Sequence, residues 1–143
     1  MQSSAEKCIA AAERILTYAD NTKKKLKFKL KSKGYSDDDI AEAIDFLTSN
    51  GFLNEERMLE SAVRFYSDKK LFGESRIKKE LFVKGFERED IMNYPFEEID
   101  FEEICYELFI KLGGEDDDKT KNKLRLYGHS YSDIKSAVSR EEE

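Results

Sequence analysis

The residues that most often carry out chemistry are few in this chain, and none stands in a catalytic or metal-binding motif. His129 is the only histidine and has no cysteine or acidic residue at metal-ligand spacing, so we predict a surface turn residue. The acidic runs Asp37–Asp39 and Asp116–Asp118 lack the interleaved spacing and closing glutamate of a calcium loop. Neither a phosphate-cradling glycine loop nor a nucleophile elbow occurs. We therefore predict no enzyme activity, no metal and no cofactor.

The two cysteines indicate a reducing compartment. Cys8 and Cys105 are far apart in sequence and neither has a CxxC partner, so we expect two reduced thiols. No apolar run approaches the roughly 20 residues that cross a membrane, and no signal peptide opens the chain. These features predict a cytoplasmic protein without a membrane segment.

Clusters of basic residues are the most informative chemical feature. The net charge is −6, yet residues 23–33 hold seven lysines and no acid, and residues 64–84 hold seven basic residues against three acids. Residues 87–118 carry thirteen acids against two basic residues, and residues 119–125 turn basic again. A row of lysines is often only a solvated helix face. Basic helices that recur in stacked repeats could instead form one stripe that follows a phosphate backbone.

The elements that would position these charges recur three times. A Leu stands four residues before a Gly and an Ile six residues after it around Gly34, Gly85 and Gly128. The glycines are 51 and 43 residues apart, at the upper edge of helical repeat lengths. Each glycine can take the left-handed conformation that ends a helix. We therefore predict an all-α protein built from three copies of one helical unit.

Residues 23–33 are ambiguous when they are read alone. Leu26, Phe28 and Leu30 alternate with lysines, as in a strand, but only the four-residue Leu26–Leu30 spacing recurs in the other copies. We therefore predict a helix with Phe28 partly exposed. Tyr35, Phe72 and Phe86, beside the basic helices, could stack on bases, although core packing is the more ordinary role of such residues.

Capping and apolar patterns predict the remaining helices. Ser36 and Ser130 begin capping-box-like starts, and Asn54 can cap a helix that runs to about residue 71. The apolar stripe that we predict for this last helix consists of Met58, Ala62, Phe65 and Tyr66. The predicted core residues are Leu30, Ile44, Phe65, Leu81 and Leu108.

At these residues the sequence resembles the RecX family, bacterial regulators of the recombinase RecA. The resemblance is carried by the string from Phe52 to Arg57, continues from Arg64 to Gly73, and includes the Lys84-Gly85-Phe86 turn. It is strong from about Leu26 to Ile91 and weaker beyond Pro95. The order and spacing of these motifs, rather than any single one, make it specific.

The resemblance implies three tandem three-helix repeats in an elongated, curved monomer, at residues 1–53, 54–95 and 96–143. It also implies binding in the groove of the RecA–DNA filament, where such proteins limit ATPase activity and strand exchange in homologous recombination, DNA repair and the SOS response. This chain departs from the family pattern in its acidic span 87–118, which weakens the case for direct affinity for single-stranded DNA. It also has Thr120 where the other copies have Leu26 and Ile77.

The predicted contact surface for DNA and RecA lies on the basic helices. Arg64 and Arg76 are the first choices because arginine suits bidentate contact with phosphate or carboxylate. As exposed residues, Arg76 and Lys78 should contribute little to folding, so Arg76→Glu with Lys78→Glu should leave the thermal melt nearly unchanged. The full predicted set is Lys23, Lys24, Lys27, Arg64, Lys69, Lys70, Arg76, Lys78, Lys79 and Lys121.

A protein-only function remains the alternative. The chain could be a helical-repeat adaptor that binds proteins without nucleic acid, its charges serving solubility. Salt dependence separates the two hypotheses, because binding to single strands should weaken with a log–log slope of about −0.7 per phosphate contact.

Overall fold

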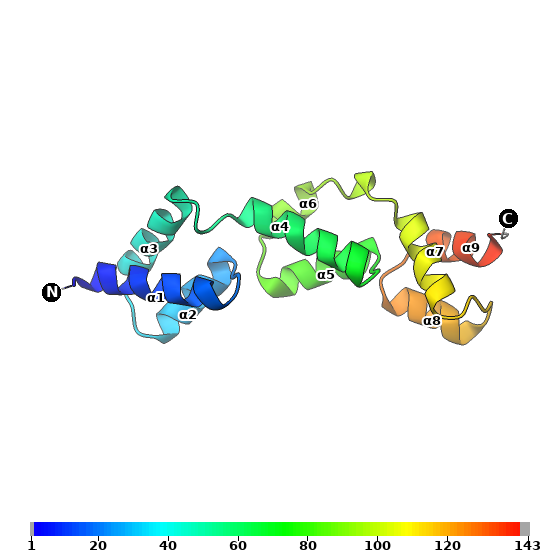
Figure 1. Cartoon of the computed structure of the whole chain (residues 1–143), viewed down its shortest axis with the longest axis horizontal. Coiled ribbons are helices and arrows are strands. Elements are labelled where there is room, and N and C mark those ends of the chain that lie inside the picture. The colour runs from blue at the N-terminus through cyan, green and yellow to red at the C-terminus, as the bar shows by residue number, and fades with distance from the viewer. Residues whose placement is uncertain (1, 141–143) are drawn as a thin grey trace. The chain divides into compact units, whose positions relative to one another are not determined.

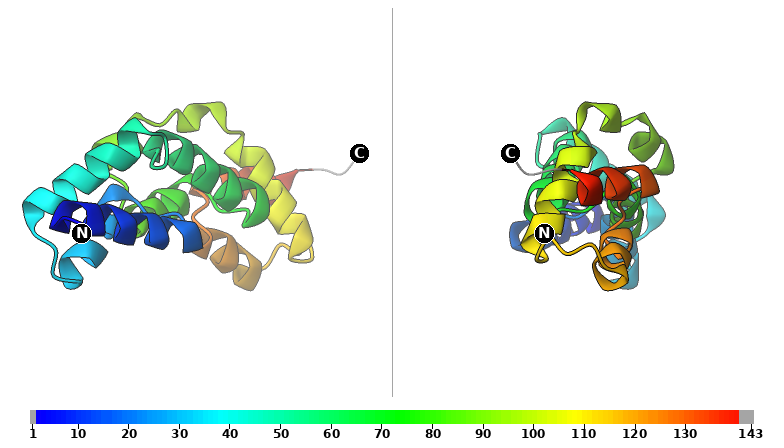
Figure 2. Two further views of the ribbon diagram at one scale, coloured as in Figure 1. Left: turned by 60° about the vertical axis from the view of Figure 1, so that its left-hand side comes forward. Right: turned by 90° about the vertical axis from the view of Figure 1, so that its right-hand side faces the viewer.

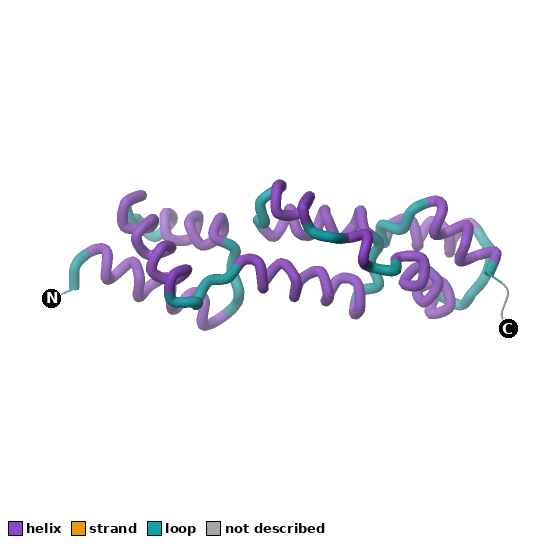
Figure 3. The backbone as a smooth tube through the Cα atoms, turned by 90° about the horizontal axis from the view of Figure 1, so that it is seen from above, coloured by secondary structure: helices purple, strands orange, loops and turns teal. Residues whose placement is uncertain are grey.

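The structure, a computed structural model that describes residues 2–140, is built from helices (Figures 1 and 3). No strand occurs in the described part of the chain, which confirms the all-α prediction. One π-helical turn, η1 (Phe65–Lys69), and one 3-10 turn, η2 (Phe96–Glu98), interrupt the α-helices. The α-helices are α1 (Ser4–Tyr18), α2 (Lys23–Ser32), α3 (Asp37–Ser49), α4 (Glu55–Arg64), α5 (Glu74–Lys84), α6 (Arg88–Asn93), α7 (Phe101–Lys111), α8 (Asp118–Leu126) and α9 (Tyr131–Ser139).

The chain forms two compact units. Unit 1 takes in the chain up to Glu60 together with Lys84–Phe86, and unit 2 takes in Ser61–Val83 and the chain from Glu87 onwards. The division therefore passes through α4. The three-repeat organisation remains a prediction, and the units are described separately below.

Unit 1 is organised around the packing of α1, α2 and α3. The three helices contact one another pairwise (Figures 1 and 2). Leu26 and Leu30 are fully buried on α2, whereas Phe28 is 74% exposed, so residues 23–32 are helical as predicted and Phe28 faces solvent. The core of this unit consists of Cys8, Ala11, Ala12, Leu26, Leu30, Ile40, Ala43, Ile44, Leu47 and Leu53.

Unit 2 contains a second core where α7, α8 and α9 meet (Figure 1). Leu81 of α5 is fully buried and Leu108 is 3% exposed, as predicted, and Ile77 of α5 is also fully buried. Thr120 is also buried, so the third copy keeps its first inward position with a polar residue in place of Leu26 or Ile77. The core residues of this cluster are Leu71, Cys105, Leu108, Phe109, Leu124, Ile134 and Ala137.

The helices begin and end where the sequence signals stand. The hydroxyl oxygens of Ser36 and Ser130 accept the N–H groups three residues on, at 3.1 Å each, and the Asn54 side chain caps α4 in the same way. At the other end, Gly34, Gly85 and Gly128 all have a left-handed backbone, with φ of 94°, 101° and 95°. After Gly34 and Gly128, the next N–H donates to the carbonyl of the repeat leucine, at 3.3 and 3.2 Å. The Leu-x3-Gly spacing is thus a helix-ending motif.

Two of these glycine turns dock on the start of another basic helix. Within unit 1, Gly85 lies against Thr22 and Lys25, and the Thr22 hydroxyl donates to the Lys84 carbonyl at 3.2 Å. Within unit 2, Gly128 lies against Gly73 and Arg76. Gly73 and Arg76 follow Thr22 and Lys25 by 51 residues, the spacing between Gly34 and Gly85. The two contacts are therefore equivalent, which supports the proposal that the chain is a repeat.

The helix from residue 55 differs from the prediction. Phe65 is 48% exposed and is not a core residue, and Met58 and Ala62 are only half-buried. Tyr66 is buried as predicted, and it is joined by Leu59 and Val63, each one residue after a predicted position, in a second stripe. Both stripes fit helical spacing, so the pattern alone could not choose between them. The π-helical turn η1 then shifts the buried face further.

His129 is also placed differently from the prediction of a surface turn residue. It is 4% exposed, and its Nε2 lies 2.8 Å from the Leu71 carbonyl oxygen, which requires an Nε2–H donor. Its Nδ1 is buried without a hydrogen-bond partner. The physical reason is the helix-ending glycine: His129 follows Gly128 as Phe86 follows Gly85, and this position folds back onto the helix end.

The burial of His129 predicts a pH dependence of stability. Burial lowers the pKa of the imidazole, and this outweighs the Leu71 hydrogen bond and the nearby Asp133 carboxylate, both of which raise it. As the pH falls, the unfolded chain therefore binds a proton on His129 before the folded protein does, and the free energy of unfolding decreases. Urea denaturation from about pH 7.5 to about pH 5 should show this decrease. The variant His129→Phe should show a smaller decrease in the free energy of unfolding over this pH range. An equal pH dependence of the two proteins would contradict the predicted effect of burying His129.

The cysteines are free and buried, as expected for reduced thiols. Burial raises the pKa of the Cys105 thiol to about 12, and the Asp133 charge adds to this rise. Burial also raises the pKa of Cys8. Neither thiol is therefore suited to act as a nucleophile.

Candidate nucleic-acid interface

Helix α2 presents a solvent face of cations around one aromatic ring. Thr22 caps the helix with a 3.3 Å hydrogen bond from the Lys25 N–H, and α2 contains no acidic residue. Because Leu26 and Leu30 turn into the core, residues at positions i, i+3, i+4 and i+7 from Lys24 share the outer side. These residues, all exposed, are Lys24, Lys27, Phe28 and Lys31, which we call the α2 face.

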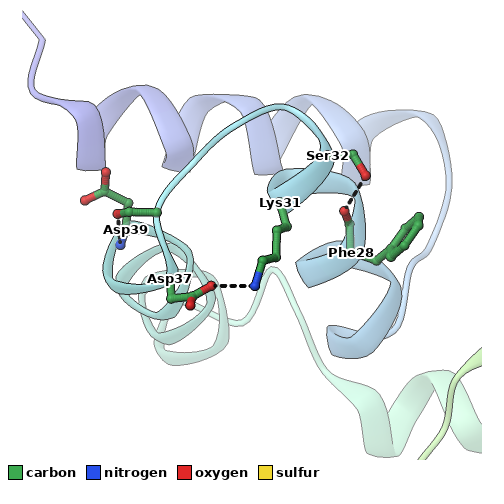
Figure 4. A network of polar contacts seen from close by, with 6 residues as sticks. Phe28, Lys31, Ser32, Asp37 and Asp39 are labelled. Atoms are coloured by element: carbon green, nitrogen blue, oxygen red, sulfur yellow. Dashed lines mark hydrogen bonds and ion pairs between the residues drawn. The ribbon is translucent and has the colours of Figure 1, made fainter.

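The close-up of this helix shows how the α2 face is held (Figure 4). Phe28 points away from α1 and α3, and its carbonyl accepts the Ser32 hydroxyl at 2.9 Å. Lys31 approaches Asp37 at 3.3 Å, but these side chains are 71% and 81% exposed. An ion pair so open to water is weak, so Lys31 remains available to another anion.

The remaining residues of α2 have partners within unit 1. Lys29 donates to the buried Asn21 side chain at 2.7 Å, and the backbone N–H of Lys23 donates to the Glu55 carboxylate. Lys25 lies beside Gly85. Of the predicted site residues on α2, Lys24 and Lys27 therefore lie on the exposed face, whereas Lys23 is half-buried at the helix start.

Arg76 has several partners, contrary to the expectation of an exposed residue with little effect on folding. Its guanidinium lies 3.0 Å from Glu80, donates to the Leu126 carbonyl at 3.0 Å, and sits 4.4 Å from the centre of the Phe72 ring. The Phe72 ring packs in turn on Tyr66 and Tyr127. Arg76 thus stabilises unit 2 by joining the start of α5 to the end of α8.

Lys78 is also engaged, whereas Lys79 is exposed. The Lys78 ammonium is 2.9 Å from Glu74 and 5.2 Å from the centre of the Phe96 ring. The charge that Lys78 was expected to offer on α5 is therefore largely balanced within the helix. Lys79 is the exposed cation among the three predicted site residues of α5.

The predicted cations outside α2 and α5 lie in two further places. Lys121 of α8 pairs with Asp116 at 2.8 Å, and this hydrogen bond raises the pKa of Lys121. Arg64, Lys69 and Lys70 are exposed at the end of α4 and of η1, and the Lys70 ammonium lies 5.7 Å from the centre of the Phe65 ring.

The other candidates serve the fold. Phe72 and Phe86 are buried, and Tyr35 is half-buried with its hydroxyl 3.4 Å from the Lys7 carbonyl, so core packing is their observed role. Asp37 and Asp39 lie in the first turn of α3, and Asp117 caps α8 through the Thr120 N–H at 2.7 Å. That hydrogen bond lowers the pKa of Asp117. Within residues 2–140 no cluster of three potential metal ligands is found.

Phe28 and Lys31 were not among the site residues predicted from the sequence. Both become members of one face only when residues 23–32 are helical, because a strand would place them on opposite sides. Their spacing from Lys24, by four and seven residues, was the available signal.

None of the described helices is long and apolar enough to pass through a bilayer.

Several known proteins are similar to this chain in sequence. The family model described as RecX, first three-helix domain, matches residues 8–47, which include α2. The chain is 31% identical to the regulatory protein RecX of Clostridium botulinum (strain Eklund 17B / Type B), over 92% of this chain and 67% of that protein. The chain belongs to the RecX family.

Further RecX proteins extend the comparison over nearly the whole chain. The regulatory protein RecX of Chlorobium limicola is 25% identical over 96% of this chain and 91% of its own length. The crystal structure of RecX from Lactobacillus salivarius superposes with a TM-score of 0.78 at 25% identity, covering 94% of each chain. The RecX resemblance and the all-helical fold that it implied are thereby confirmed.

Proposed function

We propose that this chain binds the RecA–DNA filament in the cytoplasm, as a monomer, and inhibits the ATPase activity and strand exchange of RecA. Membership of a family of regulatory proteins is the observation that carries this proposal. Regulation of this kind needs binding rather than catalysis, and the described helices include a charged face suited to binding, the α2 face.

The distribution of free cations indicates which surface meets the filament. On the α2 face, Lys31 forms an ion pair with Asp37 that is long, at 3.3 Å, and largely exposed to water. The carboxylate pairs of Arg76, Lys78 and Lys121 are shorter, at 2.8 to 3.0 Å, and less exposed. A phosphate that displaced one of these carboxylates would gain less than a phosphate bound to an unpaired lysine. We therefore propose α2 of unit 1 as the main contact, and Lys69, Lys70 and Lys79 of unit 2 as separate, secondary cations.

Co-sedimentation with filaments tests the binding step. RecA assembled on single-stranded DNA with a slowly hydrolysed ATP analogue should carry the protein into the pellet, whereas DNA alone at the same concentration should carry much less. Recovery in the pellet should fall as salt is raised, because lysine–phosphate contacts release counterions. If the protein stays in the supernatant with filaments at low salt, the proposed function is wrong.

The adaptor alternative rests on the net charge of −6 and on the internal pairing of the α5 and α8 cations. It predicts filament binding that is insensitive to salt, or no filament binding at all. The same co-sedimentation series therefore distinguishes the two functions.

A further inference from the structure

The ring of Phe28 is an apolar platform in the middle of a row of cations. Its side chain is 74% exposed, although burying a phenylalanine ring stabilises a fold by about 1.5–3 kcal/mol. Lys24 and Lys27 precede it on the same face, and Lys31 follows it. Among the described residues of unit 1, the packing does not account for a ring in this position, since Leu26 and Leu30 supply the buried contacts of α2.

This combination occurs only in the first of the three equivalent helices. At the positions equivalent to Phe28, α5 has Lys79 and α8 has Asn122. These two helices also contain the acids Glu74, Glu80 and Asp118, whereas α2 contains none. The combination of an exposed ring with a row of lysines, in a helix that contains no acid, is therefore a property of α2.

We propose that the α2 face binds single-stranded nucleic acid directly, with phosphates on Lys24, Lys27 and Lys31 and one base stacked on the Phe28 ring. The lysines span two turns of helix, about 10 Å, enough to follow a short stretch of backbone. A single strand fits better than a duplex, because only unpaired bases expose a face to an aromatic side chain. Acidic protein surfaces would satisfy the lysines but would leave the ring without a partner. This inference deepens the proposed function because it names the ligand of the α2 face. It rests on the proposed function only in taking the bound strand to be the DNA of the RecA filament.

Tryptophan at position 28 gives a direct readout, since the chain contains no tryptophan. In Phe28→Trp the indole should be quenched by oligothymidylate, because base stacking brings the base onto the ring. Heparin and an abasic oligonucleotide supply the charge without bases and should leave the fluorescence nearly unchanged. Equal quenching by all three, or by none, would overturn the proposal.

A matched control comes from α3 in the same unit. Phe46 is 42% exposed and follows Glu42 by one turn, so the charged residue next to it on its helix face is negative rather than positive. Phe46→Trp should show no quenching by oligothymidylate. In fluorescence anisotropy, Phe28→Ala should bind a labelled oligothymidylate at least about fivefold more weakly than wild type, with the salt slope preserved. Phe46→Ala should bind as the wild type does.

The outcomes separate this inference from the proposed function. Quenching of Phe28→Trp without any effect of the protein on RecA would support the inference and remove the proposed function. Salt-sensitive co-sedimentation with RecA filaments, combined with unquenched Phe28→Trp, would support the proposed function and remove the inference about the Phe28 ring. An unfolded Phe28→Trp variant would show in circular dichroism, and Phe28→Ala then decides the question.

Discussion

Gly128→Ala should destabilise the protein by about 3 kcal/mol or more. Gly128 has φ of 95°, a conformation that costs an alanine about 1–2 kcal/mol. An added Cβ would also overlap the backbone nitrogen and the Cβ of Arg76. The backbone on each side is held by hydrogen bonds from Gly73 to Tyr127 and from Ser75 to Gly128, both 2.8 Å, so the clash cannot be relieved cheaply.

Gly113→Ala provides the control within the same unit. Gly113 has φ of 113°, but nothing lies within 4 Å of its added Cβ, so only the backbone strain of about 1–2 kcal/mol applies. Gly34→Ala repeats the comparison in unit 1, with φ of 94° and equally open space. Urea denaturation followed by circular dichroism measures all three variants. Equal losses for Gly128→Ala and Gly113→Ala would show that the contact between α5 and α8 is not tight.

Reversing the three charges of the α2 face should weaken binding to single-stranded DNA at least about a hundredfold at low salt. In Lys24→Glu/Lys27→Glu/Lys31→Glu each phosphate contact becomes a repulsion. The three side chains are exposed and the Lys31–Asp37 pair is weak, so the denaturation midpoint should change little. Anisotropy titrations with labelled oligothymidylate at several salt concentrations measure both the affinity and its salt slope.

The matched control reverses three charges on α8. Lys119→Glu/Lys123→Glu/Arg125→Glu has the same net charge as the α2 variant, and all three of its residues are exposed. If overall charge decides binding, the two triple variants will bind equally weakly. If the α2 face is the site, the α8 variant will retain most of the wild-type affinity.

Local signals in the sequence predicted the helices and their ends well. Leu26 and Leu30 marked the inward side of α2, and the glycines at 34, 85 and 128 ended their helices as predicted. These features depend on neighbours within one or two turns, which the sequence displays directly.

Features that depend on distant residues could not be predicted in this way. Arg76 was expected to be free, but its partners include the carbonyl of Leu126, fifty residues away. The residue type of His129 indicates the surface, but its place after the helix-ending Gly128 buries it. Phe65 and Leu59 lay on competing stripes that only the packing of the whole chain could separate.

The DNA-dependent ATPase of the RecA recombinase from the same organism tests the central claim most directly. Preformed filaments should hydrolyse ATP more slowly as wild-type protein is added, and the α8 triple variant should act similarly. The α2 triple variant should leave hydrolysis at the rate of RecA alone. If wild-type protein leaves the hydrolysis rate unchanged at concentrations that saturate the filament, the proposed regulation of RecA is contradicted.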